Sequence, residues 1–224
     1  TVKKGTNYDT MFINEIEYYI PEDLSEVKSK MNNDENLVWK PKDIQAEWTY
    51  KNVWGTTKGT GVHNYIEVEK YNNEEYKPSK KYLKTYEKEW PLLKSQADKF
   101  FKDHPHLIWI GSEIRIADDE SGISGTIDAL FWNTKTKMLE IWDWKTNKKF
   151  TTSNFFDNLK YPFSMYDDCD LVKYSIQLGL YKYILENNTN LKLGDSTIVW
   201  LFEGNDDYEK IKALDLSEEI NKMI

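Results

Sequence analysis

The chain has 224 residues and a formal net charge of −8, with 39% hydrophobic and 15% aromatic residues. This composition predicts a globular protein of one domain or one and a half, and it excludes a disordered chain. The negative charge argues against a general polyanion binder, although local lysine patches can still hold phosphates. No apolar run approaches the ~20 residues of a membrane span, so no membrane partner is expected.

The sequence contains one cysteine, Cys169, which excludes an internal disulfide and a cysteine-rich zinc site. A single cysteine fits a reducing compartment, and no secretory signal is visible at the N-terminus. We therefore expect an intracellular protein.

The N-terminal part, up to about residue 73, is expected to be helical. Ile13, Ile16, Tyr19 and Ile20 have helical spacing up to Pro21, and a new helix is predicted to start at Pro21. Two more helices are predicted at 41–54 and 60–71, separated by a glycine-rich segment. The later helix carries His63 and Glu67, which are i, i+4 neighbours.

The middle of the chain is expected to contain a helix over 80–104, with a break at Pro91, and then a strand over 107–116. Lys80, Lys81 and Lys84 form a basic patch that suits either a solvated face or a phosphate contact. Glu113 lies on the predicted strand, where it is either an edge residue or part of a site.

Two further strands, 126–132 and 138–145, predict a hairpin that carries charged groups. Alternation places Asp143 and Lys145 on one face, and pairing can bring Asp128 close to Asp143. Two carboxylates can hold a hard divalent cation, which polarises a phosphate and lowers the pKa of bound water. Lys145 can orient that water or offset charge. The alternative is a surface hairpin with a salt bridge.

The segment 146–168 is too long and too aromatic for a simple connector. It is expected either to be a substrate-facing flap, on which bases stack, or to be pinned to the core by its aromatic residues. Lys148 and Lys149 are candidate contacts for backbone phosphates.

The C-terminal part predicts a helix over 168–187, strands over 196–202 and 208–214, and a last helix capped by Ser217. Gln177 and Tyr181 are i, i+4 neighbours on the long helix, with Tyr174 on the same side. The order of elements predicts the α/β class, with a mixed central β-sheet flanked by helices.

Three short motifs stand out in the sequence. The first is Gly-Thr-Ile-Asp at 125–128, followed by Asp-Trp-Lys-Thr at 143–146. The second has Gln177 and Tyr181 in the spacing Gln-X-X-X-Tyr, and the third is Gly-Thr-Gly-Val-His at 59–63. Together they resemble the PD-(D/E)XK nuclease superfamily, in particular its RecB-like exonuclease branch, in which similar Gln-X-X-X-Tyr and Gly-Thr-X-X-His motifs occur. The motifs follow the order of that branch.

The resemblance implies a restriction-endonuclease-like core over 74–224 and an N-terminal helical layer over 1–73 that contributes His63. It implies that Mg²⁺ or Mn²⁺ is the cofactor and that Lys145 activates water. It implies that Gln177 and Tyr181 position the substrate. The implied metal ligands are Asp128, Asp143, His63, the backbone carbonyl of Trp144 and, in assistance, Glu113.

The function that follows from the resemblance is metal-dependent hydrolysis of DNA, by an exonuclease in DNA recombination, repair or replication. The chain looks similar to phage or viral exonucleases, which places it in the cytoplasm or in the host cell. The alternatives are a structure-specific endonuclease and an inactive nucleic-acid-binding module of the same fold. The motifs leave RNA open as a substrate and predict no oligomeric state.

Overall fold

A computed structural model describes residues 8–13, 16–21, 41–78 and 87–224. The chain forms two compact units, Thr1–Lys58 and Gly59–Ile224, which are described separately. The division after residue 73 that we expected from the sequence stays a prediction. In the described part of the chain, no helix combines the length and the apolar character needed to cross a membrane.

The first unit contains an antiparallel hairpin, β1 (Tyr8–Ile13) and β2 (Ile16–Pro21), with Met11 opposite Tyr18. The helix expected across residues 13–20 is therefore wrong. Short apolar segments fit both the helical and the strand periodicity, and the isoleucine and tyrosine residues of β2 favour a strand. The helix expected from Pro21 onward falls largely on residues 22–40, which lie outside the described residues.

Both segments expected to be helical, 41–54 and 60–71, are helical, but helix α2 (Pro41–Tyr65) runs continuously through the glycine-rich segment, so the break expected between them is wrong. Each glycine costs a helix about 1 kcal/mol relative to alanine. Within the second unit, the end of α2 and the residue that follows it are held by packing, because Val62, Tyr65 and Ile66 are buried in the core. The π-helix η1 (Ile66–Tyr71) continues directly from α2.

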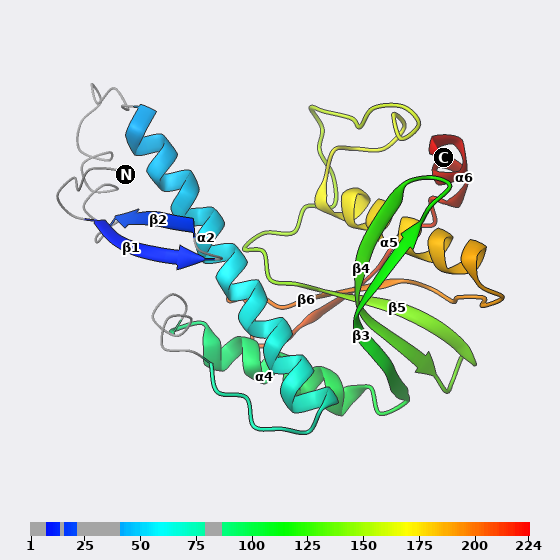
Figure 1. Ribbon diagram of the computed structural model, residues 1–224, viewed down its shortest axis with the longest axis horizontal. Coiled ribbons are helices and arrows are strands. Elements are labelled where there is room, and N and C mark those ends of the chain that lie inside the picture. The colour runs from blue at the N-terminus through cyan, green and yellow to red at the C-terminus, as the bar shows by residue number, and fades with distance from the viewer. Residues whose placement is uncertain (1–7, 14–15, 22–40, 79–86) are drawn as a thin grey trace. The chain divides into compact units, whose positions relative to one another are not determined.

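The second unit is built on a five-stranded mixed sheet in the order β3-β4-β5-β6-β7 (Figure 1). The α/β class and the mixed sheet that we predicted are confirmed. Only β5 and β6 pair in parallel, and the other neighbours are antiparallel. The strands are β3 (Leu107–Asp118), β4 (Ile123–Asn133), β5 (Met138–Lys145), β6 (Thr197–Trp200) and β7 (Glu209–Lys212).

Helices pack on both faces of this sheet. Leu93, Ala97 and Phe100 of α4 (Trp90–Asp103) share one hydrophobic cluster with Trp142 and Trp144. Leu178 of α5 (Asp170–Asn188) joins a second cluster with Ile127, Leu130, Ile141 and Ile198. Residues of β5 alternate between the two clusters, so Asp143 points to the same side as Ile141.

The predicted helix over 80–104 is described only from Glu87 onward, and α4 begins at Trp90 with Pro91 in its first turn. The basic patch of Lys80, Lys81 and Lys84 lies outside the described residues. The last helix, α6 (Ser217–Met223), begins where we expected, but Ser217 is not its cap. Asp215 instead accepts a hydrogen bond from the backbone N–H of Ser217 at 3.1 Å.

Candidate metal centre

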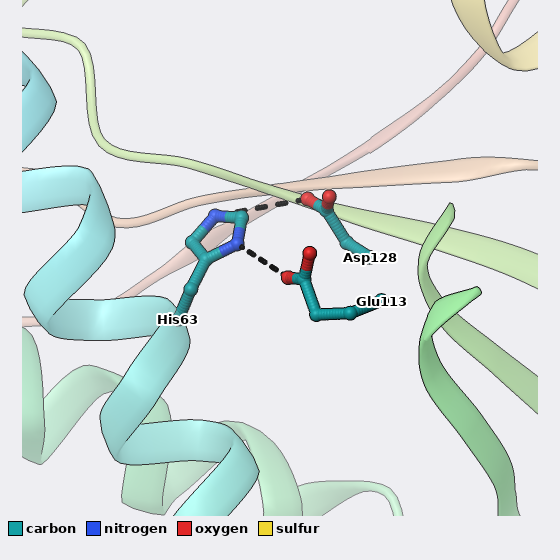
Figure 2. Close-up of side chains that lie close together, drawn as sticks. All are labelled: His63, Glu113 and Asp128. Atoms are coloured by element: carbon teal, nitrogen blue, oxygen red, sulfur yellow. Dashed lines mark hydrogen bonds and ion pairs between the residues drawn. The ribbon is translucent and has the colours of Figure 1, made fainter. Parts of the chain in front are cut away.

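Three side chains from distant parts of the second unit converge at one point: His63, Glu113 and Asp128 (Figure 2). Each offers one ligand atom, and these atoms lie within 4.8 Å of one another. His63 Nε2 is 3.7 Å from Asp128 Oδ2, and His63 Nδ1 is 3.4 Å from Glu113 Oε1. His63 stands in the last turn of α2, next to the buried Val62 that fixes this turn against the core.

Strand register explains why the two carboxylates meet. Ser112 pairs with Ala129 and Ile114 pairs with Ile127, so Glu113 lies opposite Asp128 across β3 and β4. Glu113 also has a φ of 49°, in the left-handed region that non-glycine residues rarely occupy. Such backbone strain costs on the order of 1–3 kcal/mol and concentrates at functional sites.

Strand β5 completes the surroundings of Asp128. Ala129 pairs with Trp142, and the same register puts Asp128 opposite Asp143 one residue further on. The backbone N–H of Trp144 donates to Asp128 Oδ2 at 2.9 Å. The carbonyl oxygen of Trp144 lies 3.2 Å from His63 Nε2, so it faces the same point as the Asp128 carboxylate.

Asp143 and Lys145 form an ion pair beside this cluster, with 2.5 Å between Lys145 Nζ and Asp143 Oδ2. Asp143 is 1% exposed, and apart from the ion pair with Lys145 neither of its carboxylate oxygens has a hydrogen-bond partner among the described residues. The Lys145 ammonium also lies 4.7 Å from the ring centre of Tyr174 on α5. A buried carboxylate that has lone pairs without hydrogen-bond donors is well suited to a cation.

The charges around the cluster shift its protonation equilibria. Burial, and then the neighbouring Asp128 carboxylate, raise the pKa of Asp143 to about 7. Burial alone would lower the pKa of His63, but the hydrogen bond with Glu113 and the charge of Asp128 outweigh it and raise that pKa. The hydrogen bond from His63 lowers the pKa of Glu113. Without a metal ion, Asp143 and His63 therefore hold protons more tightly than usual, and these protons offset the negative charge of the neighbouring carboxylates.

Burial and the neighbouring carboxylates have opposite effects on the pKa of Lys145, and the net effect favours the charged form. Burial lowers the pKa of its ammonium group, but the carboxylates of Asp143 and Asp128 raise it by more. Lys145 therefore stays a cation next to the two acids.

The donor set fits a hard divalent cation. Carboxylate and carbonyl oxygens suit Mg²⁺ and Mn²⁺, and an imidazole nitrogen suits Mn²⁺ better than Mg²⁺. The atoms available are the oxygens of Asp128, Asp143, Glu113 and the Trp144 carbonyl, and a ring nitrogen of His63.

Two predicted site residues lie on the same side of the sheet as Asp143 but outside this cluster. Gln177 Nε2 donates to Tyr181 Oη at 3.0 Å, and the Tyr181 ring lies against Gly125 of β4. Within the described residues, neither side chain forms a hydrogen bond with His63, Glu113 or Asp128. Their role in positioning substrate stays a prediction.

Lys148 and Lys149, the predicted phosphate contacts, are exposed just after β5. The contact between Lys145 and Tyr174 is one that we did not predict from the sequence. The sequence did contain a sign of it, because helical spacing places Tyr174 on the same side of α5 as Gln177 and Tyr181. Glu67, the helical neighbour of His63, is partly buried on η1.

The sequence was also compared with known proteins. No protein-family model matches this chain, and no curated protein matches it significantly.

Proposed function

We propose that the chain is a divalent-metal-dependent nuclease of the PD-(D/E)XK type, which hydrolyses phosphodiester bonds of DNA. The observation that supports this most is the convergence of His63, Glu113 and Asp128 beside the Asp143–Lys145 pair. These residues come from one helix and three strands, and all of them except Glu113 belong to the motifs that resemble the RecB-like branch. The proposal includes a restriction-endonuclease-like core within the mixed sheet.

In this proposal, Asp128, Asp143 and the Trp144 carbonyl hold Mg²⁺ or Mn²⁺, with His63 completing the ligand set. Such an ion supplies positive charge that polarises a phosphodiester and acidifies water. Lys145 is fixed between Asp143 and the Tyr174 ring, where it can orient water or offset negative charge in the transition state. Neutral His63 and ionised carboxylates are required, because protonated groups do not coordinate metal.

The test is cleavage of end-labelled linear DNA and of covalently closed circular DNA with added Mn²⁺, Mg²⁺ or Ca²⁺. We expect cleavage with Mn²⁺ and Mg²⁺, none with Ca²⁺, and none after addition of EDTA. Release of nucleotides from linear DNA alone identifies an exonuclease, whereas nicking of circles identifies the alternative, an endonuclease. The same assay on an RNA strand tests the second substrate class.

Matched variants connect the activity to the site. Asp143→Asn, Asp128→Asn and Lys145→Ala should abolish cleavage, whereas Asp119→Asn, on the exposed turn after β3, should leave it unchanged. Full activity in EDTA, or full activity of Asp143→Asn, would contradict the proposal. Nucleic-acid binding without cleavage under any metal would instead favour the inactive binding module.

A further inference from the structure

The most exposed apolar side chains in the described residues gather on the loop between β5 and α5, residues 146–169. Phe155 is 94% exposed, Phe156 93%, Met165 87% and Tyr161 78%. In the rest of the described chain, no large hydrophobic side chain exceeds 53% exposure. Large apolar side chains that are this exposed usually mark a site of interaction.

The loop has a defined conformation. The N–H of Asn154 donates to Asp167 Oδ2 at 2.9 Å, and the N–H of Asp168 donates to the carbonyl of Asp157 at 2.9 Å. Phe163 is buried in a cluster with Leu216 and Ile220, which pins the middle of the loop. From the sequence, the loop was expected either to be pinned to the core or to face a substrate. Phe163 pins the loop, and the exposed aromatic side chains remain accessible to a ligand.

Both ends of the loop lie next to the candidate metal centre. The loop starts directly after Lys145, and Tyr174, on the first turns of α5, packs against both Lys145 and Phe150. Asp170 Oδ2 accepts hydrogen bonds from the N–H and the hydroxyl of Thr151, at 2.8 and 2.9 Å, and so ties the two ends together. Figure 1 shows the loop standing away from the sheet beside the start of α5.

The shape of this surface favours flat ligands taken one at a time. Phe155 and Phe156 keep more than nine tenths of their surface open, so neither ring is packed against the other or against the rest of the described chain. A protein interface needs a packed patch, whereas a nucleic-acid base stacks on a single ring. Bases within a duplex are already stacked on one another, so unpaired bases are the matching ligand.

The charges on the loop agree with a nucleic-acid strand. Lys148, Lys149 and Lys160 are exposed and can meet backbone phosphates. Two of the loop's acids already have partners, because Asp167 accepts a hydrogen bond from the backbone N–H of Asn154 and Asp168 forms an ion pair with Lys173 of α5.

We propose that Phe155 and Phe156, assisted by Tyr161 and Met165, form a platform on which unpaired bases of a single DNA strand stack beside the metal centre. This inference rests on the proposed function and specifies its substrate: a single strand, or the single-stranded end of a duplex.

Binding without cleavage tests the platform. In EDTA, fluorescence anisotropy measures the Kd for a labelled oligothymidylate and for a blunt hairpin duplex. The Phe155→Ala/Phe156→Ala double variant should weaken oligothymidylate binding by at least about fivefold per ring, and leave duplex binding nearly unchanged. Because both rings are exposed, its melting temperature should equal that of the wild type. Leu191→Ala, beyond the far end of α5, is the matched control.

The outcomes separate the two proposals. An unchanged Kd for oligothymidylate in the double variant, with metal-dependent cleavage intact, overturns the platform and leaves the nuclease proposal standing. A wild-type protein that neither binds nucleic acid nor cleaves it with any metal overturns both. Sedimentation of the wild type as a dimer and of the double variant as a monomer would show that a second copy covers the rings, which also overturns the platform.

Discussion

At the scale of single residues, the two ring nitrogens of His63 face different partners. Nε2 lies near Asp128 and the Trp144 carbonyl, while Nδ1 lies near Glu113. If Nε2 serves the metal, an N–H at Nδ1 is directed at Glu113, which fixes the tautomer and the orientation of the ring. In that arrangement Glu113 acts through His63, and its strained backbone holds the carboxylate in reach.

Glu113→Gln should therefore weaken the site without destroying it. Glutamine keeps the length of the side chain and an acceptor oxygen, but it loses the charge that raises the basicity of His63. Because such supporting groups typically contribute 10–100-fold to metal affinity, we expect about tenfold weaker Mn²⁺ binding and reduced cleavage. Calorimetric titration with Mn²⁺ measures this, with Glu120→Gln on the exposed turn as the control. Loss as complete as in Asp128→Asn would make Glu113 a direct ligand.

Alternation along β5 was sufficient to predict from the sequence that Asp143 and Lys145 share a face near Asp128. His63 was a different case, because 65 residues separate it from Asp128 and only the resemblance to a family associated the two. The left-handed conformation of Glu113 could not be predicted, since the alternation rule assumes regular strand geometry.

At the scale of elements, α5 approaches β4 closely where the strand has no side chain. A Cβ at Gly125 would lie 2.2 Å from a ring carbon of Tyr181, much closer than real Cβ contacts. The Gly-Thr-Ile-Asp motif thus has a packing reason for its glycine, three residues before Asp128. Tyr181 helps to set the distance between α5 and the strand that carries this acid.

Gly125→Ala should destabilise the protein by roughly 1–3 kcal/mol, because the ring or the helix must shift. The same substitution in a Tyr181→Ala background should cost clearly less, since the space is then free. Urea denaturation of the four proteins in this cycle gives the coupling free energy. Gly55→Ala, where nothing lies within 4 Å, is the control and should be neutral or stabilising. Equal costs in both backgrounds would disprove the proposed contact.

The sequence predicted the strands and helices of the second unit well, because long periodic segments such as 126–132 and 138–145 match one template only. It failed at the β1–β2 hairpin, because β2, a six-residue strand rich in isoleucine and tyrosine, fits helical spacing equally well. It also failed at the centre of α2, because the glycines and threonines there predict a break on local propensity. Burial of Val62, Tyr65 and Ile66 stabilises the following turns regardless of that propensity.

At the scale of the whole molecule, the candidate centre links stability to pH. The raised pKa of Asp143 means that the folded protein retains a proton that an unfolded aspartate loses near pH 4. The pKa of His63 is also raised, so the folded protein keeps the His63 proton at pH values just above the ordinary histidine pKa, where the unfolded chain loses it. Both groups therefore remove stability from the metal-free protein as pH rises toward and through about 7.

Other groups affect stability in a different pH range, or make the protein more stable as pH rises. The pKa of Glu113 is lowered, so its contribution is lost only in acid, below its ordinary range. Burial lowers the pKa of His104 and of His106, so these two groups add stability as pH rises toward their ordinary value. A comparison with Asp143→Asn isolates the centre, because the variant keeps both of these histidines.

Metal binding should reverse this loss of stability. A divalent ion binds only the folded site and needs deprotonated ligands, so it should restore the stability that ionisation of Asp143 removes. The rise in melting temperature on adding Mn²⁺ should be small at about pH 5.5 and should grow steadily to about pH 8. Thermal unfolding across that range, with and without Mn²⁺, measures it.

In Asp143→Asn the rise should disappear at every pH, and the metal-free protein should lose less stability between the two pH limits than the wild type does. Asp119→Asn should behave like the wild type in both respects, because that carboxylate lies on an exposed turn. A rise of equal size at both ends of the range would mean that the ion binds groups already ionised in acid. In that case the bound metal would lie elsewhere than at the buried Asp143 carboxylate.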